Sequence, residues 1–158
     1  MNKPELYQKT VDILVQAYFN DTLRHDDCAA CAVGNIIADA LGYKITSTKA
    51  KWQCDDGEVS PNWINVFCTY YTPSGRKVTS FDLAAYEEGA ANEIDATNYT
   101  VHELADMEKA FEMASTEGDY MFNGLMAVIE VLDQIHENTD TELTATTKSR
   151  FNKTQSVQ

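Results

Sequence analysis

The feature that most constrains the fold is an apolar stripe with helical spacing in the last third of the chain. Between residues 120 and 135 the large apolar residues recur every three or four positions, as Phe122, Leu125, Met126, Ile129, Leu132 and Ile135. This spacing places them on one face of a helix, and Asp119 can cap the start of that helix. We therefore expect this segment to be the longest and most hydrophobic helix and to lie in the core.

Two other segments have clear helical patterns. Pro4 suits the first position of a helix, and the residues after it predict an amphipathic helix of about 16 residues, with one face made of Leu6, Thr10, Ile13, Leu14, Ala17 and Tyr18. Thr100 and Glu103 have the spacing of a capping box, in which each side chain accepts a hydrogen bond from the other residue's backbone amide. The helix that they open has an inner face of Leu104, Met107, Ala110, Phe111 and Ala114.

The segment from His25 to Gly42, HDDCAACAVGNIIADALG, predicts a helix that packs on the first one as a helical hairpin. Asp26 or Asp27 can accept hydrogen bonds from its first backbone amides, and Gly42 can supply the left-handed residue at its end. Asn35 falls on the buried side of this helix, so we expect its side chain to hydrogen-bond a neighbouring loop.

Residues 43 to 80 leave two interpretations open. As a helix opened by Ser60 and Pro61, residues 63 to 71 would place their aromatic side chains on one face. As strands, WINVFCTYY and RKVTSF would form a hairpin across the turn TPSG. We favour the hairpin. Residues 81 to 94 then predict a short helix, although Gly89 disfavours it by about 1 kcal/mol relative to Ala.

These elements predict a mainly α fold, a single-domain bundle of about five helices with a small inserted β-hairpin. A chain of 158 residues has the length of one domain, and we assign residues 1 to 137 to it. Residues 138 to 158 hold six Thr and one aromatic residue, Phe151. We expect a flexible polar tail there.

Charge is distributed unevenly along the chain. The 25 acidic and 12 basic residues give a formal net charge of −13, and residues 81 to 142 hold 16 acidic residues and one basic residue, Lys109. Such a field repels nucleic-acid phosphates and anionic membrane surfaces, so direct binding to either is not expected. A protein partner is expected, and its candidate binding residues are Glu87, Glu88, Asp106 and Glu108. The alternative is that these carboxylates only solvate surface helices.

The cysteines are the residues that suggest a metal or redox site. His25, Cys28 and Cys31 form an HxxCxxC run, which can direct all three side chains toward one point, and zinc takes four ligands of this kind. With Cys54 and Cys68 as the further thiols, a zinc site is one alternative, and no other cofactor is predicted. A thiol redox site at Cys28 and Cys31 is another, because the start of a helix stabilises a thiolate. The third alternative is that Cys28 and Cys31 pack in the core as small apolar side chains.

The CxxC pair in a helical chain resembles the carboxymuconolactone decarboxylase and alkylhydroperoxidase D family, and the resemblance implies peroxidase-type redox chemistry. That family expects a histidine three residues after the second cysteine, where this chain has Gly34. The chain also lacks a GxSxG elbow, an HExxH motif and a Gly-rich phosphate loop. His102 and His136 are expected to be surface residues rather than catalytic bases. The sequence therefore favours a protein that is not an enzyme.

Over most of its length the chain resembles small proteins encoded in bacterial and bacteriophage genomes, through ELYQKTVDILVQAYFN, CAACAVGN and MFNGLMAVIEVLDQIH. The resemblance implies a bacterial or phage setting and no particular activity. Because the sequence has no secretory-type apolar run and no apolar segment of membrane-spanning length, we expect a cytoplasmic location. The function that we expect is that of an acidic, non-enzymatic protein-binding or regulatory protein. A related alternative is that its acidic face imitates DNA and occupies a nucleic-acid-binding protein.

Overall fold

The computed structural model of the protein describes residues 3–24, 29–46, 52–54, 57–59, 67–71, 73–75, 77–81, 87, 90–114 and 120–136. Within these residues the fold is mainly helical, as predicted, with five helices and two small antiparallel sheets. The helices are α1 (Lys3–Phe19), α2 (Ala32–Leu41), α4 (Ala91–Asp95), α5 (Val101–Ala114) and α6 (Tyr120–Ile135). The expected tail over residues 138 to 158 lies outside the described residues.

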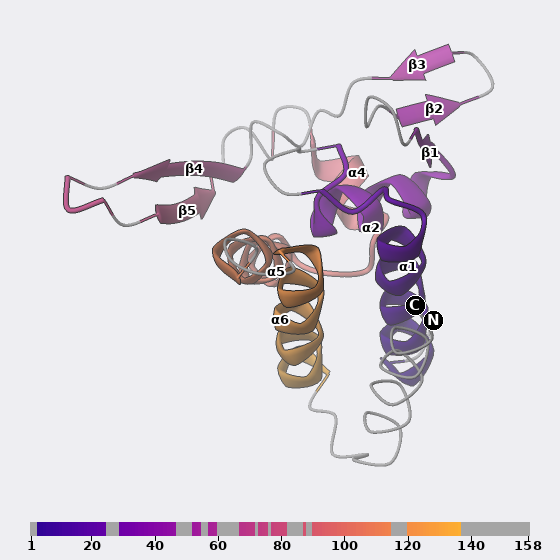
Figure 1. Cartoon of the computed structure of the whole chain (residues 1–158). Helices are drawn as coiled ribbons and strands as arrows, with labels where there is room; N and C mark the ends of the chain where they lie inside the picture. Colours follow the sequence, from indigo (N-terminus) through magenta and orange to yellow (C-terminus); the bar gives the residue numbers. More distant parts are fainter. Residues whose placement is uncertain are drawn as a thin grey trace.

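The four longer helices share one hydrophobic core. In Figure 1, α1 and α6 stand side by side, α2 lies across the end of α1, and α5 packs against α6. Each of these helices contributes fully buried apolar side chains, among them Val11, Leu14, Val33, Ile37, Leu104, Met107, Phe111, Leu125, Ile129 and Leu132. Burial of each large apolar side chain favours folding by about 1.5–3 kcal/mol. The stripe predicted for α6 therefore does face the core, although α6, with 16 residues, is one residue shorter than α1.

Helix α2 starts later than the sequence predicts. Its N-cap is Cys31, whose side chain accepts a hydrogen bond from the backbone amide of Gly34, and its first helical residue is Ala32. Ala29 and Ala30, which precede it, form a turn rather than a first helical turn. The predicted stop is confirmed, because Gly42 has a φ of 75°, and its amide donates to Ala38 and Asp39. Only glycine adopts this left-handed conformation without strain.

The predicted hairpin is confirmed over the described part of its range. Strand β4 (Phe67–Tyr71) pairs antiparallel with β5 (Lys77–Phe81), and the two project from the helical body in Figure 1. Residues 61 to 66 lie outside the described residues, so the helical alternative is excluded for residues 67 to 71 alone. The short helix expected from residue 81 is wrong at its start, since Phe81 belongs to β5. Its described helical residues are Glu87 and Ala90, which have π-helical conformation, and those of α4, which begins at Ala91.

A three-stranded sheet that the sequence did not predict lies beside α2. It contains β1 (Lys44–Ile45), β2 (Trp52–Cys54) and β3 (Gly57–Val59), all antiparallel with β2 at the centre. Trp52 connects this sheet to the residues before α2. Its indole is fully buried, and its Nε1 donates a hydrogen bond to the carbonyl oxygen of Ala29 at 2.9 Å. The ring of Tyr43 lies against it, with ring centroids 5.8 Å apart.

The start of α5 has the predicted capping box. The backbone amide of Thr100 donates to Glu103 Oε1 at 2.8 Å, and the amide of Glu103 donates to Thr100 Oγ1 at 3.1 Å. Both bonds give a partner to backbone amide groups that the first turn of a helix otherwise leaves without a hydrogen-bond acceptor.

No helix in the described part of the chain has the length and apolar character needed to span a bilayer.

Candidate functional site

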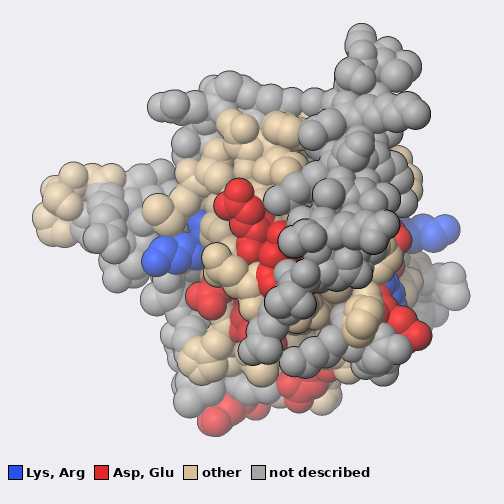
Figure 2. Space-filling model, turned by 90° about the horizontal axis from the view of Figure 1, so that it is seen from below, with Lys and Arg blue, Asp and Glu red and all other residues tan. Residues whose placement is uncertain are grey.

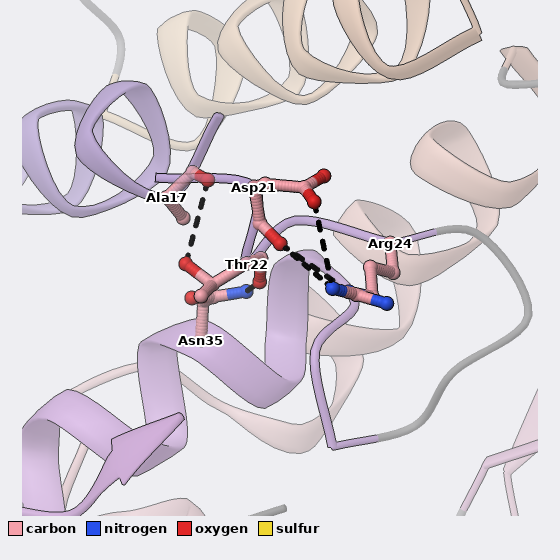
Figure 3. Close-up of polar contacts among 5 residues, drawn as sticks. All are labelled: Ala17, Asp21, Thr22, Arg24 and Asn35. Carbon is pink, nitrogen blue, oxygen red and sulfur yellow. Dashed lines mark hydrogen bonds and ion pairs between the residues drawn. The ribbon is translucent and has the colours of Figure 1, made fainter. Parts of the chain in front are cut away.

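The buried side-chain amide of Asn35 links α2 to the residues that precede it. Its Nδ2 donates to the carbonyl oxygens of Thr22 at 2.8 Å, Ala30 at 3.0 Å and Cys31 at 3.0 Å. Figure 3 shows the Asn35 amide directed at Thr22. The expectation that Asn35 ties α2 to a neighbouring loop is confirmed, since Thr22 and Ala30 both precede α2.

Asp21 and Arg24 stabilise the outer side of the same turn. Asp21 has a left-handed φ of 59°, and its carbonyl oxygen accepts hydrogen bonds from Arg24 Nε at 3.3 Å and Nη2 at 3.2 Å. The Asp21 carboxylate lies 3.6 Å from the same guanidinium, as Figure 3 shows. These contacts close the turn around an otherwise strained backbone conformation.

Cys31 meets two buried carboxyl groups of α5. Glu108 is 6% exposed and Glu112 is 3% exposed, and they lie one helical turn apart on the same face. The Glu108 carboxyl group lies near the Cys31 thiol, the backbone amide of Val33 and the Glu112 side chain, and all three influence its pKa. We call these three residues, Cys31, Glu108 and Glu112, the thiol–carboxyl cluster.

Burial changes the acidity of the cluster. Loss of solvation, and then the neighbouring charge of Glu112, raise the pKa of Glu108 to about 8. Burial, and then the charge of Glu108, raise the pKa of the Cys31 thiol well above 9. At neutral pH Glu108 is therefore mainly a neutral acid and Cys31 a neutral thiol. A thiol in this state is a poor nucleophile, because the thiolate is the reactive form.

The residues predicted for a metal or redox site do not all fall within the described structure. His25 and Cys28 lie outside the described residues, and the side chain of Cys68, in β4, is not described either. Cys31 is buried in the thiol–carboxyl cluster, and Cys54 is partly exposed with its thiol donating to the Gly57 carbonyl at 3.4 Å. Among the described residues no three ligand-type side chains are placed to hold a metal ion. Zinc binding stays a prediction.

The predicted partner-binding residues separate into different environments. Glu87 and Asp106 are exposed, and Glu88 lies outside the described residues. Glu108 belongs to the core, so its assignment to a partner-binding surface is wrong. The physical reason is its position four residues after Leu104, which places it on the buried face of α5. Figure 2 shows that acidic side chains are more widespread than basic ones on the face of the molecule seen there.

A surface groove lies between α5 and α6, and it contains Asp106. Its volume is about 550 Å³, and it is lined by Asp106, Lys109, Ala110, Met113, Val131, Gln134 and Ile135. Met113 is 47% exposed, and among the described residues it is the large apolar side chain that stays in solvent. We call this feature the α5–α6 groove.

A second cavity, of about 330 Å³, lies where α1, α2 and β1 meet. Tyr43 and Lys44 line one side of it, and Asn35 and Asp39 line another. Asp39 is paired with Lys9 at 3.6 Å, although both side chains are well exposed. An ion pair of this kind contributes at most about 1 kcal/mol.

Sequence reasoning missed a polar network that links α1 to the end of α6. Tyr99 is buried, and its hydroxyl oxygen lies 2.7 Å from Thr10 Oγ1 and 2.8 Å from His136 Nε2. Burial raises the pKa of Tyr99 to about 12. Beside it, the Tyr7 hydroxyl donates to Asp133 Oδ1 at 2.7 Å. His136 is therefore a partly buried structural residue and not the surface residue that the sequence indicated.

No protein-family model, curated protein or solved structure matches the chain. The functional proposals below therefore rest on the geometry and charge of the described residues.

Proposed function

We propose that the protein binds a basic, amphipathic segment of a protein partner in the α5–α6 groove. The observation that carries this proposal is the exposed Met113 in a groove that Asp106, two helical turns earlier on α5, also lines, in a chain of net charge −13. A flexible thioether side chain at the edge of a groove can adapt to different apolar partners. The proposed partner places an apolar side chain against Met113 and basic side chains along the rim.

The apolar residues that line the groove support an anchor of this kind. Ala110 and Met113 come from α5, and Val131 and Ile135 come from α6. A helix laid in a groove typically inserts apolar residues spaced three and four apart. The small side chain of Ala110 lets such a residue approach α5 closely.

The charge along the groove favours a basic partner. Asp106 lies on its lining, Glu103 precedes Asp106 by one turn of α5, and Glu130 precedes Gln134 by one turn of α6. The lining itself holds one acidic residue, Asp106, and one basic residue, Lys109, so the acidic excess comes from Glu103 and Glu130 outside the lining. Electrostatic complementarity of this kind speeds association and selects against acidic partners.

The test uses designed peptides and the five methionine methyl groups as probes. Two helical peptides of equal length carry the same apolar face, one with lysines and the other with glutamates on the polar face. The lysine peptide is expected to shift the Met113 methyl signal in a carbon-13 NMR titration, whereas the glutamate peptide is not. The signal of Met107, which is fully buried, serves as the internal reference.

Two variants locate the interaction. Asp106→Lys should weaken binding of the lysine peptide by about threefold to tenfold, since one exposed charge pair is worth at most about 1 kcal/mol and its reversal adds repulsion. Asp12→Lys, at an exposed site on α1, is the matched control and should change affinity less. Equal binding of both peptides, or no shift at Met113 with either, would show that the proposal is wrong.

A further inference from the structure

We infer that the cavity between α1 and α2 binds a small organic amine, whose ammonium group is held between the side-chain oxygen of Asn35 and the carboxylate of Asp39. This cavity, which we call the α1–α2 cavity, has a volume of about 330 Å³, and such a volume suits a ligand of modest size. It is separate from the α5–α6 groove, because the two share no lining residue.

Asn35 offers the cavity a hydrogen-bond acceptor that the described residues leave unused. The side chain lines the cavity and is 6% exposed. Its Nδ2 faces three backbone carbonyl oxygens, which fixes the orientation of the amide, because an oxygen in that place would face acceptors only. Its Oδ1 accepts no hydrogen bond from the described residues, yet this oxygen is not enclosed within the protein. A ligand in the cavity can therefore donate to it.

The Asp39 carboxylate is a second acceptor on the same side of α2. It lies one helical turn after Asn35, so the two side chains project from one face of the helix, and both line the cavity. Asp39 Oδ2 lies 3.6 Å from the Lys9 ammonium nitrogen, which shows that an ammonium group reaches this carboxylate. That distance exceeds the about 2.7–2.9 Å of a charged hydrogen bond, and both side chains are exposed. A ligand can therefore replace Lys9 at little cost.

The ends of two helices add to the preference for a cation. The last turns of α1 and α2 both contribute to the lining, with Gln16 and Ala17 from α1 and Ala38 and Asp39 from α2. Neither helix has a basic residue in its last turn. The C-terminal end of a helix carries a partial negative charge, which favours a cation. An ammonium group, with three N–H donors, fits this set of acceptors better than a hydroxyl or a carboxylate group.

The remaining lining residues limit the rest of the ligand. Ile13 and Ile45 are partly buried apolar residues of the lining, so they favour an apolar body beside the ammonium group. The described lining includes one basic residue, Lys44, whose charge opposes a second cationic group. The chemical class of the ligand is therefore a primary monoamine with a short apolar body, rather than a polyamine.

The test is a titration of the isotope-labelled protein with phenethylamine, followed by proton–nitrogen NMR at neutral pH, where the amine is protonated. The Asn35 side-chain amide and the backbone amides of Ala38, Asp39 and Tyr43 are expected to shift, whereas the backbone amide of Met113, in the α5–α6 groove, is not. Phenethyl alcohol has the same apolar body, with a hydroxyl in place of the ammonium group. It should bind at least about tenfold more weakly, because hydrogen bonds that involve a charged group are stronger than neutral ones.

Asp39→Asn removes the charge and keeps the shape of the side chain. It should weaken binding of phenethylamine by about threefold to tenfold and leave binding of phenethyl alcohol unchanged. Asp12→Asn, at an exposed carboxylate of α1 outside the cavity, is the matched control and should bind both compounds as the wild type does. No shift with phenethylamine, equal affinity for the amine and the alcohol, or an equal effect of the two variants would overturn the inference.

Discussion

The carboxyl group of Glu108 affects how the stability of the fold depends on pH. Its pKa in the folded protein is raised to about 8, from an ordinary value of 4.5. Between these two values the folded state binds more protons than the unfolded state, so this group makes the free energy of unfolding fall as pH rises. The free energy of unfolding falls through this group by at most about 1.4 kcal/mol per pH unit.

Glu108→Gln should remove this contribution. Urea unfolding of the wild type and the variant at about pH 5.5, 6.5 and 7.5 measures it, because the other titrating groups cancel in the difference. We expect the variant to gain stability relative to the wild type at each step upward in pH. A difference that is independent of pH would contradict a buried, proton-bound Glu108.

Asn35 makes a separate prediction at the α1–α2 turn. Asn35→Ala leaves the carbonyls of Thr22, Ala30 and Cys31 without the side-chain donor that serves them. Loss of a donor to buried acceptors costs about 1–3 kcal/mol, which chemical denaturation at constant pH would measure. Asn20→Ala, at an exposed amide of the same turn, is the control, and we expect it to change stability by less than about 0.5 kcal/mol.

Single residues differ in how far the sequence reveals their roles. Asn35 was found because a polar residue inside an apolar helical face needs a hydrogen-bond partner. The same reasoning applies to Glu108 and Glu112, which follow Leu104 at intervals of four and so share its face. The charge of Glu108 led to its assignment to a surface instead. Cys31 as an N-cap was not predictable, because Ser, Thr, Asp and Asn dominate that position.

At the level of whole elements, the capping box sets the start of α5. Thr100→Ala removes the acceptor of the Glu103 amide and should destabilise the protein by about 1 kcal/mol. For a chain of this size that corresponds to a fall of about 2–4 °C in Tm, measurable by circular dichroism. Glu103→Gln keeps an oxygen that can accept from Thr100, so its Tm should stay close to that of the wild type. A loss in Glu103→Gln equal to that in Thr100→Ala would mean that the charge of Glu103 contributes as much as the Thr100 hydrogen bond.

The three long helices α1, α5 and α6 were predictable and the three-stranded sheet was not, because the sequence pattern of a short element is repeated too few times. Helices α1, α5 and α6 each span several turns, so their apolar spacing is repeated often enough to be recognised. Strands β1, β2 and β3 have two or three residues each, too few for the alternation that marks a strand. Strand β4, with five residues rich in aromatic side chains, was recognisable.

For the molecule as a whole, the net charge of −13 makes stability sensitive to salt. Repulsion among the acidic side chains opposes the compact state, and dissolved ions screen it over about 10 Å at 0.1 M. Raising sodium chloride from about 20 mM to about 300 mM should therefore raise Tm. Thermal unfolding followed by circular dichroism measures this, with sucrose at equal osmolality as the uncharged control. A Tm that stays constant with salt would show that the acidic residues are too far apart to repel.

Helix α5 contributes residues to both the α5–α6 groove and the thiol–carboxyl cluster. Its solvent side lines the α5–α6 groove with Asp106, Lys109 and Met113, while its core side carries Glu108 and Glu112. The groove and the thiol–carboxyl cluster are thus opposite faces of one rigid element. A substitution on either face should be checked for its effect on the other.

The buried position of Trp52 makes its fluorescence an intrinsic probe of the contact between the small sheet and the helices. Its indole is sealed from solvent, bonded to Ala29 just before α2, and packed near Tyr43. In a Trp63→Phe variant, which leaves Trp52 as the single tryptophan of the chain, the fluorescence of this ring therefore reports on the contact between the small sheet and the helices. A shift of its emission toward longer wavelength, at a pH where circular dichroism shows the helices intact, would show that the Trp52 indole has become exposed to water while the helices remain folded.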